Sequence, residues 1–119
     1  MGAPVTHFEI YGKDAAALRA FYSELFGWEI HADNPMNYGL IHTNAPGDKG
    51  IGGGIAEGDA RVNVVPEVED LQATLDKAVA LGAEVVTPVT VIPGQVTFAE
   101  FRDPAGNVLG IASTVVPEG

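Results

Sequence analysis

The sequence predicts an α+β fold of two tandem βαβββ repeats, which form a curved mixed sheet with a concave cleft and with the helices on its outer face. The same order of elements occurs twice, in residues 5–56 and in residues 62–114. Neither copy can bury both its helix stripe and its sheet face alone, so we expect the copies to join within one chain or to exchange with a second chain. At 119 residues the chain has the length of one domain, here residues 1–119.

The spacing of equivalent residues supports the duplication. Asp14 and Asp70, which can each cap a helix, lie 56 positions apart. Gly54 and Gly110, each in the last strand of its copy, have the same separation of 56. Gly27 and Gly82, which each end a helix, lie 55 apart, so the second helix is expected to be one residue shorter.

The first copy begins with a strand in which apolar and polar residues alternate. Phe8 and Ile10 point to one side, and His7, Glu9 and Tyr11 to the other. A helix then follows, with an apolar stripe of Leu18, Phe21, Tyr22 and Leu25, and it ends at Gly27. Three further strands are predicted at residues 28–32, 38–43 and 51–55, with a loop at 44–50. The glycines at 52–54 leave one strand face bare, which indicates either a bulge or a close approach by another group.

The second copy repeats this order. The predicted elements are a strand at 62–68, a helix after Asp70 that ends at Gly82, a strand at 84–87 and a final hairpin. The helix stripe consists of Leu71, Leu75, Ala78 and Val79. Residues 87–94 are apolar but contain two prolines, which predicts an irregular loop or an edge strand.

The hairpin has two apolar-rich runs, 96–101 and 107–113, joined by a turn that contains Asp-Pro and Gly. A turn centred near Ala105 places Glu100 opposite Gly110. One face then carries Phe98, Glu100, Arg102, Val108, Gly110 and Ala112. The other face, with Ala99, Phe101, Leu109 and Ile111, is more apolar and is expected to lie against a helix.

Composition excludes several classes of function. The formal net charge of −10 makes the electrostatic interaction with phosphate repulsive, so neither nucleic acid nor an anionic membrane is an expected partner. The chain has no cysteine, hence no disulfide, no thiolate nucleophile and no cysteine metal site. No run of residues is long and apolar enough for a membrane span or a secretory signal, which predicts a cytoplasmic protein.

Three stretches together resemble a known family. They are VTHFEIYGKDAAALRAFYSELFGWEI, EVEDLQATLDKAVALGAEVV and FAEFRDPAGNVLGI. They resemble the vicinal oxygen chelate superfamily of glyoxalases, bleomycin resistance proteins and extradiol dioxygenases, and the resemblance covers residues 5–113. It implies the duplicated fold, whereas activity stays open, because this fold hosts metal enzymes, metal-free binders and resistance proteins alike.

The resemblance also implies where a metal would bind. Metal-using members carry one ligand near the start of each repeat's first strand and one on each repeat's last strand. These positions fall on His7, Asn63, Gly54 and Gly110. Since only His7 is a conventional ligand, we expect no metal and no other cofactor. An alternative set of His7, Glu9 and Glu100 is disfavoured, because strand neighbours at i and i+2 point in parallel and rarely converge.

Strand parity predicts which side chains form the inner face of the cleft. The catalytic candidates are His7, Glu9 and Glu100. The ligand-binding candidates are Tyr11, Tyr38, His42, Asn63, Phe98 and Arg102. Titratable groups that meet aromatic rings in a concavity are typical of a small-molecule site.

Structural roles compete with these functional ones. Arg102 could form a structural ion pair with Glu100 or Glu67, and His7 could be a hydrogen-bonded histidine without a role in chemistry. Trp28 is expected in the core or at a dimer interface, and His31 in solvent.

Two functions follow from these residues. The first is a metal-independent homodimer that binds an aromatic or antibiotic-like small molecule without converting it. The second is a glyoxalase-like lyase or isomerase that uses His7 with Glu9 or Glu100 as acid and base. A third reading is an accessory subunit whose strands serve only in dimerisation.

Overall fold

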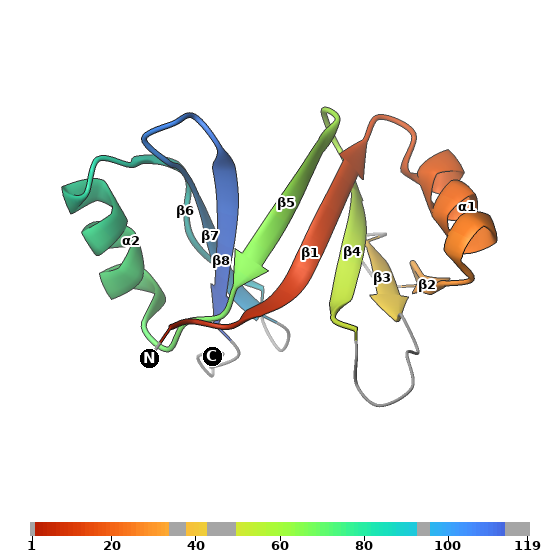
Figure 1. The fold of residues 1–119 in the computed structure, drawn as a ribbon, viewed down its shortest axis with the longest axis horizontal. Helices are drawn as coiled ribbons and strands as arrows, with labels where there is room; N and C mark the ends of the chain where they lie inside the picture. The colour runs from red at the N-terminus through yellow and green to blue at the C-terminus, as the bar shows by residue number, and fades with distance from the viewer. Residues whose placement is uncertain (1, 34–37, 43–49, 93–95, 114–119) are drawn as a thin grey trace. The chain divides into compact units, whose positions relative to one another are not determined.

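The computed structural model describes residues 2–33, 38–42, 50–92 and 96–113. In order, the elements are β1 (Val5–Gly12), α1 (Ala15–Phe26), β2 (Glu29–His31), β3 (Gly39–His42), β4 (Gly52–Glu57), β5 (Arg61–Pro66), α2 (Leu71–Ala80), β6 (Glu84–Ile92), β7 (Val96–Arg102) and β8 (Val108–Ser113) (Figure 1). The α+β class and the two βαβββ repeats are confirmed. Thr43 and most of the predicted loop at 44–50 lie outside the described residues.

The chain divides into two compact units, Thr6–Asn63 and Met1–Val5 with Val64–Gly119. The second unit resumes at Val64, two residues after the predicted start of the second copy. That residues 1–119 form a single domain stays a prediction. No helix among the described residues is long and apolar enough to cross a membrane.

The sheet of the first unit has the strand order β2-β3-β4-β1, with β5 as the next neighbour of β1. Strands β1 and β4 run parallel, and Glu9 lies opposite Gly54. The core consists of Ile10, Ala15, Ile41 and Ile55, with Phe8, Leu18, Tyr22, Trp28 and Ile30 packed against it. Trp28 is thus a core residue, and its ring centroid lies 5.5 Å from that of Phe8.

Helix α1 begins and ends as the sequence predicts. The Asp14 carboxylate accepts a hydrogen bond from the Ala17 amide at 3.0 Å, and Gly27 ends the helix with a left-handed φ of 70°. The predicted stripe is only half right, because Phe21 and Leu25 are 56% and 58% exposed. Helix α1 instead turns Ala15, Leu18 and Tyr22 to the core.

The second unit contains the antiparallel sheet β6-β7-β8. Glu100 lies opposite Gly110, as predicted from the hairpin turn. The apolar hairpin face packs on α2, where Ala99 and Ile111 share a core cluster with Leu71 and Leu75. Burial of these side chains fixes both the register of the hairpin and the face that α2 covers.

The turn of this hairpin is stabilised by one carboxylate. Asp103 accepts hydrogen bonds from the Asn107 side chain at 3.0 Å and from the amides of Asn107 and Ala105 at 2.9 and 2.8 Å. These bonds, those from Asn107 first, lower the pKa of Asp103. Asp103 therefore fixes the turn conformation that sets the register of β7 and β8.

Strand β6 extends to Ile92, so residues 87–92 form the predicted edge strand rather than a loop. Its register to β7 shifts between Val85 and Thr87 and again between Thr87 and Thr90. The second shift contains Pro88. Because proline has no amide hydrogen, Pro88 cannot donate a hydrogen bond to the neighbouring strand.

Candidate functional site

Side chains on the polar face of β1 form a hydrogen-bond network in the first unit. Because neighbouring residues of a strand point to opposite faces, Phe8 and Ile10 turn to the core and His7, Glu9 and Tyr11 lie on the other face. This alternation is the one that the sequence predicts. All three polar residues are half-buried, which brings them within reach of the neighbouring strands.

Glu9 is the centre of a hydrogen-bond network on this face. Its Oε2 accepts a bond from the Tyr38 hydroxyl at 2.9 Å. Its Oε1 accepts bonds from the Tyr11 hydroxyl at 3.1 Å and from Asn63 Nδ2 at 3.0 Å. The bond to Glu9 also satisfies Asn63, a polar residue that is only 2% exposed. Three donors on one carboxylate hold it in place and favour an anchoring role for Glu9 over that of a free proton acceptor.

Tyr38 links Glu9 to His7. The Tyr38 oxygen lies 2.9 Å from His7 Nε2. A tyrosine hydroxyl has a single proton, and here it is donated to Glu9. His7 Nε2 must therefore donate to the tyrosine oxygen, which leaves Nδ1 of a neutral imidazole as an acceptor. No hydrogen bond to Nδ1 exists within the described part of the chain.

Burial sets the protonation of both residues. It lowers the pKa of His7 below the ordinary value of 6.5, and the negative charge of Glu9 offsets this only in part. Burial, followed by the charge and the hydrogen bond of Glu9, raises the pKa of the Tyr38 hydroxyl far above its ordinary value. At neutral pH these shifts favour a neutral imidazole and a protonated tyrosine, and both forms are compatible with the direction of the two hydrogen bonds.

The glycines of β4 make room for two aromatic rings. A Cβ at Gly54 would overlap the hydroxyl and ring carbons of Tyr38, and one at Gly53 would overlap the ring of Phe8. Gly52 has no such neighbour, since a Cβ there would be 3.5 Å from the Ile41 carbonyl oxygen. At Gly53 and Gly54 the predicted close approach of another group is thus confirmed, whereas Gly52 has no such neighbour.

The residues of the first unit do not fit the metal that the fold family implies. Gly54 has no side chain to bind a metal, and Tyr38 fills the space above it. His7 Nε2 is bonded to Tyr38, and Asn63 Nδ2 to Glu9. Among the residues that the structure describes, no group of three or more His, Cys, Asp or Glu could hold a metal ion.

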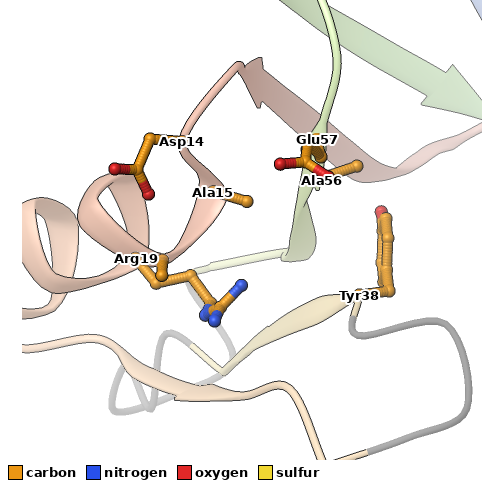
Figure 2. Close-up of a pocket in the computed structure, with 7 residues that line it drawn as sticks. Asp14, Ala15, Arg19, Tyr38, Ala56 and Glu57 are labelled. Carbon is orange, nitrogen blue, oxygen red and sulfur yellow. The ribbon is translucent and has the colours of Figure 1, made fainter.

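A cavity of about 460 Å³ lies beside Tyr38, at the start of α1 and the end of β4 (Figure 2). Its lining residues are Asp14, Ala15, Ala16, Arg19, Tyr38, Ala56 and Glu57. Of these only Tyr38 was predicted as a site residue. The glycine at position 39 is the one sequence feature connected with the other lining residues. A Cβ at Gly39 would be 2.7 Å from Arg19 Cδ, so the glycine allows the Arg19 side chain to pass close to the backbone.

Two more residues of the first unit have neighbours that the sequence did not indicate. The guanidinium carbon of Arg61 lies 4.2 Å from the centre of the Tyr11 ring, a cation–π contact. His42 is exposed, and strand parity places it on the same face as Leu40. Its ring neighbour is His31, at a distance of 5.7 Å between ring centroids. His42 is thus not part of the network around Glu9.

The candidates in the second unit have partners of their own. Glu100 Oε1 accepts a bond from the Thr87 hydroxyl at 2.7 Å. Arg102 forms its ion pair with Glu84, at 3.5 Å, rather than with Glu100 or Glu67. The expected partners were wrong because Glu84 lies directly opposite Arg102 in the ladder. Phe98 is half-buried opposite Ala112. A site that combines Phe98, Glu100 or Arg102 with His7 and Glu9 stays a prediction.

Residues 5–111 match the family described as the Glyoxalase/Bleomycin resistance protein/Dioxygenase superfamily. No protein of curated function matches the sequence significantly.

Solved structures share the fold at low identity. The Mn(II)-bound glyoxalase from Novosphingobium aromaticivorans is 18% identical with a TM-score of 0.68, and the match covers 98% of this chain but only 40% of that protein. A superfamily member from Vibrio splendidus 12B01 is 16% identical with a TM-score of 0.62, over 94% of this chain and 98% of its own. The Streptomyces coelicolor methylmalonyl-CoA epimerase variant Q60A, in complex with 2-nitronate-propionyl-CoA, is 14% identical with a TM-score of 0.65, over 96% and 99%.

Proposed function

Because the chain belongs to the glyoxalase/bleomycin resistance protein/dioxygenase superfamily, we propose that it is a metal-independent member that binds a small molecule. The ligand is aromatic or antibiotic-like, and it lies on the polar face of the sheet of a homodimer. The residues that contact it come from the network of His7, Glu9, Tyr11, Tyr38 and Asn63.

One observation carries this proposal: the ring of Tyr38 lies over Gly54. In a metal-using relative this strand position supplies a ligand, whereas here an aromatic ring covers it and its hydroxyl is bonded to Glu9 and His7. The polar groups that a metal would need are thus bonded to one another. An organic ligand needs fewer polar groups than a metal ion does. Aromatic ring faces and one hydrogen-bond acceptor can bind it.

The groups on this face favour an aromatic molecule with a hydrogen-bond donor. His7 Nδ1 is an acceptor, and the aromatic groups are the rings of Tyr38 and of Tyr11, over which the Arg61 guanidinium lies. The net charge of −10 attracts cations and repels anions at long range. A cationic aromatic compound meets all three conditions.

The proposal is tested by thermal denaturation with a panel of cationic aromatic antibiotics and, separately, with Mn²⁺, Ni²⁺ and Zn²⁺. Since a ligand that binds only the folded state raises the melting temperature, at least one antibiotic should raise it and the metals should not. His7→Ala should abolish the shift, while the matched variant His31→Ala, an exposed histidine outside the network, should keep it. A panel without any shift, or an equal shift in His7→Ala, counts against binding at this face.

The homodimer is the second part of the proposal. Three large apolar side chains of α1, those of Phe21, Leu25 and Phe26, are each more than half exposed. Apolar groups gathered on one helix favour association in water. Size-exclusion chromatography with light scattering at micromolar concentration should give twice the chain mass. A monomer mass would contradict the proposed homodimer.

A lyase or isomerase is the alternative, and the state of His7 favours it. A neutral imidazole with an open Nδ1 is a competent general base for a proton next to a carbonyl group. In this alternative Nδ1 removes that proton, while Tyr38 and Glu9 orient the ring as positioning residues. The solved structures of similar fold include a glyoxalase and an epimerase.

Proton exchange distinguishes the two functions. A base at Nδ1 should exchange the α-proton of a small α-oxo compound with deuterium from the solvent, which NMR of the compound detects directly. His7→Ala should abolish exchange and keep the fold. Exchange that is undiminished in His7→Ala, or absent with the unaltered protein, would contradict the enzymatic alternative and leave binding as the remaining function.

A further inference from the structure

The cavity beside Tyr38 contains charges of both signs that are not paired with each other. Arg19 and Asp14 line it from the start of α1, and Glu57 lines it from the end of β4 (Figure 2). Within the described residues the Arg19 guanidinium makes no hydrogen bond or ion pair, and neither does the carboxylate of Glu57. A cavity of about 460 Å³ is in the size range of small-molecule sites, about 300–1,000 Å³.

The side chain of Arg19 is held in position rather than free in solvent. Its stem runs along the backbone at Gly39, where a Cβ would be 2.7 Å from Cδ and 3.2 Å from Cγ. The residue as a whole is half-buried. A positioned guanidinium loses little side-chain entropy when it binds an anion, and it presents paired N–H donors that match a carboxylate.

The charges of the cavity select against simple ions. Asp14 already uses one carboxylate oxygen to cap α1, which leaves Glu57 as the carboxylate of this cavity that has no partner among the described residues. A simple anion is repelled at long range by a chain of net charge −10. A simple cation would lie next to the positive charge of Arg19. A molecule that carries both a carboxylate and an ammonium group avoids both penalties.

We propose that this cavity is a binding site for a small zwitterion, with Arg19 binding its carboxylate and Glu57 its ammonium group. Because Arg19 and Glu57 line the cavity from different elements, α1 and β4, and form no ion pair, we expect the two charges of the ligand to be separated as well. We therefore expect 4-aminobutyrate and 6-aminohexanoate to bind more tightly than glycine, in which both charges lie on one carbon. This site does not depend on the function proposed above.

Calorimetric titration of the 119-residue protein with these three amino acids tests the site, with butyrate and butylamine as single-charge probes. Arg19→Met keeps the stem on Gly39 and removes the guanidinium, and it should weaken binding of the best zwitterion about tenfold or more. Glu57→Gln should weaken it by a smaller factor. The controls Glu24→Gln, on the same helix, and Lys77→Gln should change the affinity less than about twofold.

Three results would overturn the site: no binding of any zwitterion at millimolar concentration, binding of butyrate as tight as that of 6-aminohexanoate, or an unchanged affinity in Arg19→Met. None of the variants alters His7, Glu9 or Tyr38. The zwitterion site and the function proposed for the polar face of β1 can thus fail independently of each other.

Discussion

The two repeats carry a glycine at the same place in their last strand but surround it differently. In the first unit, Gly54 lies under Tyr38, and the bonds of this ring join residues 31 and 29 positions apart in the sequence. In the second unit, Thr87 bonds to Glu100 and Glu84 pairs with Arg102 between the directly paired strands β6 and β7, and Ser113 of β8 donates to the Glu69 carbonyl at 3.5 Å. The duplicated backbones thus support a network centred on one carboxylate in the first copy and separate side-chain pairs in the second.

The difference predicts that substitutions in the first unit have the larger effects, and Gly54→Ala the largest. The new Cβ would overlap Tyr38, which has to move and lose its bonds to Glu9 and His7. Overpacking of this kind should lower the free energy of unfolding by about 2 kcal/mol in urea denaturation. The matched variant Gly52→Ala, on the same strand, meets only an ordinary contact and should change it by less than about 0.5 kcal/mol. Equal losses in both variants would contradict the packing of Tyr38 over Gly54.

Tyr38→Phe should have the next largest effect. It removes a donor from Glu9 and the acceptor of His7 Nε2 while it keeps the ring over Gly54. Leaving half-buried polar groups without partners should cost about 1–2 kcal/mol of unfolding free energy. The control is Tyr22→Phe, since the Tyr22 hydroxyl makes no hydrogen bond within the described residues. Nitrogen NMR should also show His7 as a single tautomer in the unaltered protein and as a mixture in Tyr38→Phe.

Acidification should destabilise the first unit through His7. The pKa of this residue is lowered in the folded state, so below its ordinary value of 6.5 the unfolded chain binds more protons than the folded one. Stability should therefore fall as the pH drops from about 7 through 6, by at most about 1.4 kcal/mol per pH unit for one proton. Urea denaturation at several pH values should show a flatter dependence in His7→Gln. An unchanged slope in His7→Gln, or the same flattening in His31→Gln, would assign the effect to other groups.

The smallest effect is expected in the second unit, from Arg102→Met. The Arg102 and Glu84 side chains are 48% and 77% exposed, and their charged atoms lie 3.5 Å apart. Surface pairs of this kind contribute little, so the free energy of unfolding should change by less than about 0.5 kcal/mol. A loss as large as that of Tyr38→Phe would show that this pair, too, is part of a larger network.

The sequence predicts the elements of both repeats because local signals determine them. Asp14 and Asp70 cap the helices, and the turn around Asp103 sets the register that places Glu100 opposite Gly110. Alternation along β1 likewise predicts that His7, Glu9 and Tyr11 share a face. Each of these features depends on residues that are close in sequence or on strand periodicity.

The contacts that define the site could not be predicted in this way. Strand parity selects Tyr38 and Asn63 as neighbours of the polar face, but it does not show that both donate to Glu9. The position of Arg19 depends on where α1 packs against β3, and no periodicity encodes that. Phe21 and Leu25 have helical spacing yet remain exposed, because the core is filled by other residues of α1 and by Trp28.

The central claim is that Tyr38 takes the place of a metal ligand above Gly54. It is tested most directly by elemental analysis of the untagged protein after dialysis against Mn²⁺, Ni²⁺ and Zn²⁺ and removal of the free ions. We predict far less than one metal ion per chain for each of the three. About one ion per chain, lost in His7→Ala, would contradict the claim and would make a metal-dependent enzyme the better account of this protein.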